Sequence, residues 1–182
     1  NLVYLCRSFG LPEVAEYWNQ VIVMNDWQKK RFAQNMVASM FNTVSGKKIG
    51  ILGFAFKKDT GDTRETPAID VCNLLLAEKA LISIHDPKVS REQIYMDLGK
   101  DKMDKIEIED DPYVTCAGAH AIAILTEWDA FKCTNLDYQK IFDSMQKPAF
   151  IFDGRNIVDI PKLQAIGFHC WAVGKSLTPT IS

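Results

Sequence analysis

The chain has 182 residues, of which 47% are hydrophobic and 24% are charged. This composition is typical of a globular domain, and it excludes a largely disordered chain or a small disulfide-stapled protein. Lys and Arg number 21 against 23 Asp and Glu, so the formal net charge is -2. That balance excludes a general nucleic-acid binder, because such proteins carry a basic excess to neutralise phosphates.

The sequence has no sign of membrane insertion or secretion. No apolar run reaches the roughly 20 residues that a bilayer-spanning helix needs, and the first residues lack the pattern of a signal peptide. The five cysteines form no Cys-x-x-Cys pair and the three histidines are scattered, so neither a zinc site nor a disulfide framework is expected. A reducing compartment fits this usage, and we expect a cytoplasmic protein. Because the chain begins with Asn rather than Met, we expect a piece of a longer protein.

The first 45 residues have a helical pattern. Apolar residues at positions 2, 5, 6 and 9 line one helix face, and Gly10 ends that helix. From Pro12 to about Phe41 there is no internal Gly or Pro, which predicts one helix roughly 45 Å long at 1.5 Å per residue. A helix of this length favours a bridge between domains or packing against a second subunit. Two shorter helices broken near Asn25 and Asp26 are the alternative.

From residue 46 short apolar runs alternate with helical segments. Thr66-Pro67 has the composition of a helix start, since Thr caps a helix and Pro fits its first turn. This alternation predicts βαβ units, so the fold class is α/β, with an N-terminal long-helix segment followed by a Rossmann-like doubly wound, mainly parallel sheet. The expected strands are 48–53, 81–84, 105–108, 119–125, 149–152 and 168–173, and the expected helices are 66–79, 91–98, 110–116, 137–145 and 159–166. The tail after Gly174 has no core pattern and is expected to fray.

The loop after the first expected strand has the features of an anion site. It carries Lys57, Lys58 and Arg64 and leads into a helix N-terminus, whose unpaired N–H groups favour phosphate. It lacks the Gly-x-Gly-x-x-Gly pattern of dinucleotide loops, because bulky Phe54 and Phe56 follow the strand. A pocket walled by side chains is therefore expected. A solvated loop is the alternative, since three acidic residues balance the cations.

A tight turn at Asp153-Gly154-Arg155 places Arg155 over the carboxyl edge of the sheet, where ligands bind in such folds. The usual strand order makes the first strand a neighbour of the strand before this turn, so we expect Lys57, Arg64 and Arg155 to converge on one crevice. A lone surface arginine is the alternative.

Two further strand ends carry polar residues. Asp86 stands where a dinucleotide domain reads a ribose, but an Asp-Pro turn is the favoured interpretation. The segment Thr126-Glu127-Trp128 is interpreted as a turn with a packed Trp. The cysteines have no partner His at a suggestive spacing, so buried packing is expected for all five.

Several stretches are similar to one enzyme family. Residues 53–65, Gly-Phe-Ala-Phe-Lys-Lys-Asp-Thr-Gly-Asp-Thr-Arg-Glu, closely resemble the start of the C-terminal domain of animal UDP-glucose 6-dehydrogenases, within the UDP-glucose/GDP-mannose dehydrogenase family. The helical opening, residues 1–6 and 11–41, resembles the central helical region of that family. Further matching stretches are 86–89, 91–94, 126–128 and 147–155.

The resemblance implies a two-step oxidation of UDP-glucose to UDP-glucuronate, with NAD as cofactor and a Cys thiolate as nucleophile. In that family the nucleophile and the NAD-binding domain precede the part that this chain matches. We therefore expect no catalytic residue and no metal in this chain, and no activity of the chain alone. The implied substrate-binding residues are Phe56, Lys57 and Arg155, and Arg64 is the implied cofactor-binding residue.

The resemblance also divides the chain into a central helical dimerisation segment, 1–45, and a C-terminal UDP-sugar-binding Rossmann-like domain, 46–182. It implies a homo-oligomer, with a dimer through the long helix and a hexamer in the full enzyme, to which a segment like residues 39–43 contributes. Two alternatives remain. One is an autonomous dinucleotide-binding module, which the Phe-rich loop disfavours, and the other is a structural assembly module in which the long helix is the working part.

Overall fold

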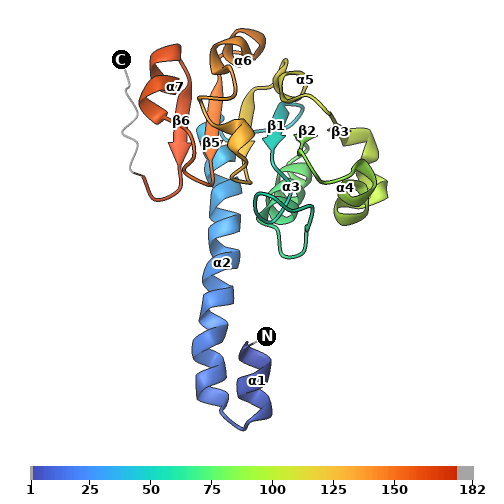
Figure 1. Ribbon diagram of the computed structural model, residues 1–182, viewed down its shortest axis with the longest axis vertical. Helices are drawn as coiled ribbons and strands as arrows, with labels where there is room; N and C mark the ends of the chain where they lie inside the picture. Colours follow the sequence, from blue (N-terminus) through green and yellow to red (C-terminus); the bar gives the residue numbers. More distant parts are fainter. Residues whose placement is uncertain (1, 176–182) are drawn as a thin grey trace.

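In the computed structural model, which describes residues 2–175, a long helix projects from a sheet domain (Figure 1). This helix, α2 (Pro12–Ser39), is continuous over 28 residues, or about 42 Å at 1.5 Å per residue. The alternative of a break near Asn25 and Asp26 is wrong, because both residues lie inside α2. The short helix α1 (Leu2–Ser8) folds back along the outer end of α2. Residues 176–182, which include most of the tail expected to fray, lie outside the described residues.

The domain is built on a sheet of six parallel strands in the order β3-β2-β1-β4-β5-β6. Strand order reverses between β1 and β4, as in a doubly wound sheet, so the predicted α/β, Rossmann-like class is confirmed. All four residues of β4 are buried, because helices cover both faces of a parallel sheet. The strands are β1 (Lys48–Leu52), β2 (Leu81–His85), β3 (Ile106–Ile108), β4 (Ala121–Ile124), β5 (Phe150–Asp153) and β6 (His169–Ala172).

Each helix that follows a strand begins at a side-chain cap that the sequence already suggests. Thr66 accepts a hydrogen bond from the N–H of Ala68 at the start of α3, and an Asp or a Ser caps each of the other four in the same way. Such caps satisfy N–H groups that have no partner inside the helix. These helices are α3 (Pro67–Ala77), α4 (Arg91–Leu98), α5 (Pro112–Cys116), α6 (Tyr138–Ser144) and α7 (Ile160–Ile166), and two 3-10 turns, η1 (Lys100–Lys105) and η2 (Asp129–Phe131), were not predicted.

The inner half of α2 belongs to the core of the sheet domain. Phe32 and Met36 are buried, and the Phe32 ring packs edge-on against Trp171 of β6, with 5.4 Å between ring centroids. Lys29 Nζ lies 2.7 Å from Asp26 and 2.5 Å from Asp70 on α3, which ties the helix to the domain. The division into 1–45 and 46–182 stays a prediction.

The part of α2 up to Trp27, together with α1 and the turn between the two helices, exposes large apolar side chains. Phe9 is 77% exposed and Tyr17 is 70% exposed, and Val21, Met24 and Trp27 are also exposed. Large apolar patches that are exposed to solvent typically mark sites of interaction with a partner. No helix within residues 2–175 combines the length and apolar character needed to cross a membrane.

Candidate functional site

The loops that follow β1, β2, β4 and β5 meet at the carboxyl edge of the sheet, on the side from which α2 projects (Figure 1). The loop after β1, residues 53–66, is called the β1–α3 loop below. It carries three of the four predicted site residues, Phe56, Lys57 and Arg64, and the fourth, Arg155, follows β5. Side chains from the other three loops hold the β1–α3 loop in place.

Asp86, directly after β2, is one of these anchors. Its Oδ2 accepts hydrogen bonds from two N–H groups of the β1–α3 loop and from the indole N–H of Trp128, in the loop after β4. Its Oδ1 accepts hydrogen bonds from two N–H groups of its own turn. The Asp-Pro turn interpretation is confirmed, and Asp86 has a wider role that the sequence did not suggest. The donors are the main-chain N–H groups of Phe54, Ala55, Lys88 and Val89 and the indole N–H of Trp128, at 2.7–3.1 Å.

Thr126, after β4, is a second anchor. Its hydroxyl donates to the carbonyl oxygen of Ala55 at 2.6 Å, and both groups are buried. The loop approaches closely here, because a Cβ added to Gly53 would lie 2.5 Å from Cβ of Thr126. Gly53 also has φ of +94°, a conformation that glycine adopts without strain. Trp128 is 6% exposed, so the interpretation of residues 126–128 as a turn with a packed Trp is confirmed, although it missed the hydrogen bond of Thr126.

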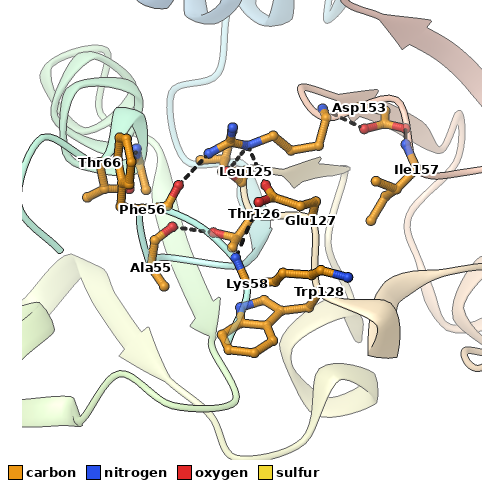
Figure 2. A network of polar contacts seen from close by, with 12 residues as sticks. Ala55, Phe56, Lys58, Thr66, Leu125, Thr126, Glu127, Trp128, Asp153 and Ile157 are labelled. Carbon is orange, nitrogen blue, oxygen red and sulfur yellow. Dashed lines mark hydrogen bonds and ion pairs between the residues drawn. The ribbon is translucent and has the colours of Figure 1, made fainter. Parts of the chain in front are cut away.

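Arg155 reaches across β4 to the β1–α3 loop. The buried carboxylate of Asp153 accepts the N–H of Arg155 at 2.8 Å and so shapes the turn after β5. From this turn, Arg155 Nε donates to the carbonyl oxygen of Leu125 at 2.7 Å, and Nη2 donates to the carbonyl oxygen of Phe56 at 2.8 Å (Figure 2). The expected adjacency of the two strands is wrong, since β4 lies between β1 and β5. The length of the arginine side chain spans that extra strand.

Glu127 lies between the β1–α3 loop and the turn after β5. Its Oε1 accepts the N–H of Lys58 at 3.3 Å, and its Oε2 lies 3.3 Å from Nε of Arg155 (Figure 2). Lys58 in turn places Nζ 3.4 Å from the carboxylate of Asp129. No local pattern predicts this role of Glu127, because nothing in a Thr-Glu-Trp turn reports contacts with residues so distant in the chain.

The four predicted site residues are brought together only in part. Arg155 contacts the main chain of Phe56, a residue that is 44% exposed, and Lys57 follows Phe56 as an exposed residue. The Arg64 side chain is 88% exposed and pairs with Asp62, at 2.7 Å from Nη2 to Oδ2. Hydrogen bonds from Arg64 lower the pKa of Asp62 to about 2. The described contacts therefore join Arg155 to the β1–α3 loop and leave Arg64 at its outer rim.

The cations Lys57 and Arg155 and the N-terminus of α3 suit an anionic ligand. The cysteine thiols do not suit covalent catalysis. Burial raises the pKa of Cys72, Cys116 and Cys170 to about 12, and a nucleophilic cysteine needs a lowered pKa. All five cysteines are free thiols, and only Cys72 and Cys116 are fully buried, so the expected buried packing is wrong for the other three. Within residues 2–175 there is no group of three His, Cys, Asp or Glu side chains that could hold a metal ion.

Comparisons with known proteins point to one family. The model of the UDP-binding domain of the UDP-glucose/GDP-mannose dehydrogenase family matches residues 50–160. UDP-glucose 6-dehydrogenase 1 of Glycine max is 60% identical over 195 residues, and UDP-glucose 6-dehydrogenase 4 of Arabidopsis thaliana is 58% identical over 195 residues. Both alignments cover 98% of this chain, which spans only 40% of the length of each relative.

A solved structure of a UDP-glucose dehydrogenase from Pyrobaculum islandicum has the same fold as this chain. The TM-score is 0.68 at 24% sequence identity, and the match covers 92% of this chain and 35% of that one. At this identity the likeness concerns the fold alone.

Proposed function

This chain belongs to the UDP-glucose/GDP-mannose dehydrogenase family, and we propose that it is the UDP-sugar-binding C-terminal part of an NAD-dependent UDP-glucose 6-dehydrogenase. The complete enzyme oxidises UDP-glucose to UDP-glucuronate in two steps. This chain supplies UDP-sugar binding and oligomer contacts, and it holds neither the catalytic Cys nor the NAD-binding domain. The observation that carries the proposal is the contact of Arg155 with the β1–α3 loop, inside the segment that matches a UDP-binding domain.

The proposed ligand contacts follow from the geometry of these side chains. The guanidinium of Arg155 uses Nε and one N–H of Nη2 for the main chain. Its other N–H groups form the planar fork that suits two phosphate oxygens. Lys57 adds a mobile point charge, and the exposed ring of Phe56 forms an apolar wall beside them. Together the three residues bind the diphosphate end of a UDP-sugar.

NAD does not fit this domain as its main binding site. The β1–α3 loop lacks the glycine pattern that lets a backbone touch a pyrophosphate, and the acid at the ribose-reading position, Asp86, already accepts five N–H groups of the protein. The absent half of the enzyme holds NAD in this proposal, and the exposed Arg64 reaches the cofactor from this domain. The same observations disfavour an autonomous dinucleotide-binding module.

The exposed apolar side chains of α1 and α2 support the proposed homo-oligomer. In this proposal two copies pair through α2, and the full enzyme forms a hexamer to which residues 39–43 contribute. The five free thiols support a reducing compartment such as the cytoplasm.

Calorimetric titration of the chain with UDP-glucose and with NAD tests the proposal. We expect measurable UDP-glucose binding and no tighter binding of NAD. Arg155→Ala and Lys57→Ala are expected to weaken UDP-glucose binding about tenfold each, or about 1.4 kcal/mol. Lys132→Ala is the matched control, since Lys132 is a cation near the same edge that pairs with Asp129. Tighter binding of NAD than of UDP-glucose would contradict the proposal.

In the complete enzyme, the same two substitutions are expected to raise the Michaelis constant for UDP-glucose. An unchanged Michaelis constant would favour the alternative of a structural assembly module, whose working part is the long helix. The exposed apolar face of α2 is the specific observation behind that alternative.

A further inference from the structure

Glu127 joins the two segments that build the proposed UDP-sugar site. Oε1 accepts the main-chain N–H of Lys58 on the β1–α3 loop, and Oε2 lies beside Arg155 on the turn after β5 (Figure 2). These two segments come from different ends of the sheet domain's sequence. The side chain of Glu127, in the loop after β4, therefore touches both segments.

The contact between Glu127 and Arg155 is electrostatic rather than a hydrogen bond. The N–H of Nε donates to the carbonyl oxygen of Leu125, so Oε2, 3.3 Å from Nε, receives no hydrogen bond from the described residues although it is itself buried. A buried carboxylate oxygen without a donor is costly unless a cation lies beside it. The two side chains consequently hold each other in place.

A carboxylate at this position also carries an electrostatic cost for binding. It lies next to the cation that is proposed to bind a diphosphate, and like charges repel. Its benefit is that it restrains a side chain with much rotamer freedom, so that Arg155 loses less freedom when an anion binds. The two effects have opposite signs on affinity, which makes their balance measurable.

We propose that Glu127 is a positioning residue, which holds Arg155 against the β1–α3 loop so that the guanidinium is ready for the diphosphate of a UDP-sugar. This inference rests on the proposed function. In this proposal the restraint of Arg155 outweighs the repulsion between the carboxylate and the ligand. Glu127 itself does not touch the ligand.

Titration of the chain with UDP, comparing the wild type with Glu127→Gln, tests the balance. The glutamine keeps the size of the side chain and an acceptor for Lys58 N–H, but it no longer attracts the guanidinium. We expect UDP affinity to fall between about threefold and thirtyfold, the range set by the rotamer freedom of one arginine. The control Glu65→Gln makes the same charge change at an exposed position of the same loop and is expected to leave the affinity equal or higher. Equal or tighter UDP binding by Glu127→Gln would overturn the proposal.

Two further measurements separate this inference from the proposed function. In an Arg155→Ala background, Glu127→Gln is expected to leave UDP affinity equal or higher, because the restraint on the arginine is gone and only the repulsion between the carboxylate and the ligand is removed. An equal loss with and without Arg155 would refute the positioning role. The NMR signal of the Arg155 Nε–H group needs no ligand. It is expected to shift and broaden in Glu127→Gln but not in Glu65→Gln, and an unchanged signal would overturn the inference. A wild-type chain that shows this signal but binds no UDP would instead count against the proposed function.

Discussion

Asp86→Asn is expected to destabilise the fold, because the carboxylate of Asp86 is the shared acceptor for N–H donors from three loops. Three donors meet Oδ2 and two meet Oδ1. Asparagine has the same shape but only one carbonyl oxygen. Its NH2 group must replace one of the two carboxylate oxygens and would then face N–H donors instead of accepting from them.

The size of the effect follows from the more favourable orientation of the amide. That orientation keeps the three hydrogen bonds at the Oδ2 position and loses those from Lys88 N–H and Val89 N–H. A hydrogen bond to a charged group contributes about 1.5–3 kcal/mol, so the loss of two lowers the free energy of unfolding by about 3 kcal/mol or more. For a chain of this length, that change lowers Tm by about 6–12 °C.

Urea unfolding followed by tryptophan fluorescence measures this effect, since the Trp128 indole donates to the same carboxylate. Asp129→Asn is the control, because Asp129 lies near the same edge but is exposed, and its carboxylate pairs with Lys58 and Lys132. The midpoint of this variant is expected to stay close to that of the wild type. Equal midpoints for the two variants would refute the reasoning. A stable Asp86→Asn variant that loses affinity for NAD would show instead that Asp86 reads a ribose.

Three more predictions concern the interior. Gly53→Ala is expected to lower the free energy of unfolding by about 3 kcal/mol or more, since the new side chain would combine φ of +94° with a 2.5 Å clash. Gly10→Ala is the control in the same urea assay. Gly10 has φ of +69° but no atom within 4 Å, so this substitution is expected to lower the free energy of unfolding by only about 1 kcal/mol. Burial raises the pKa of Cys72 and Cys116 to about 12, so alkylation at about pH 8 should modify both thiols only after unfolding, and mass spectrometry that finds either modified in the native chain would contradict this. Burial lowers the pKa of His120 from its usual 6.5. The stability that is present above pH 6.5 should therefore be lost as pH falls through the lowered pKa, because the unfolded chain binds the proton more readily. Unfolding midpoints measured between about pH 7 and 5 should depend less on pH in His120→Gln.

The sequence predicts every strand and every α-helix of the sheet domain to within two residues. This accuracy has a physical source, because the helix starts are marked by residues that act locally. Thr66, Asp137 and Asp159 each cap the helix that follows them, and continuous apolar runs mark the buried strands. The two 3-10 turns were not predicted, since segments of six and three residues show no useful periodicity.

The sequence predicts the candidate site only where a cationic or aromatic residue directly follows an expected strand. The sequence singles out Arg155 and Phe56 because a cation and an aromatic follow strands at the carboxyl edge of the sheet, and the structure brings the two into contact. The observed strand order is the usual doubly wound order. The expected neighbour was wrong because the strand before Arg155 is the fifth and not the fourth once the short strand β3 is counted, so β4 lies between β1 and β5. The roles of Thr126 and Glu127 are contacts with residues about 70 positions away, and no local pattern reports them. The position of Asp86 and of residues 126–128 directly after strands is a local signal, but it does not report which loop they hold.

The anchors also explain why this loop does without glycines. In a dinucleotide loop the main chain itself approaches the pyrophosphate and its N–H groups bind the ligand. Here four of the five N–H groups of residues 54–58 already donate to other protein atoms: two to Asp86, one to the carbonyl oxygen of Asp62 and one to Glu127. In the proposed function, a phosphate at this edge is therefore bound mainly by side chains, and this is the role proposed for the cations Lys57 and Arg155 beside the ring of Phe56. The same use of Asp86 as an anchor removes the ribose-reading acid, so one structural arrangement both favours an anion held by side chains and disfavours NAD.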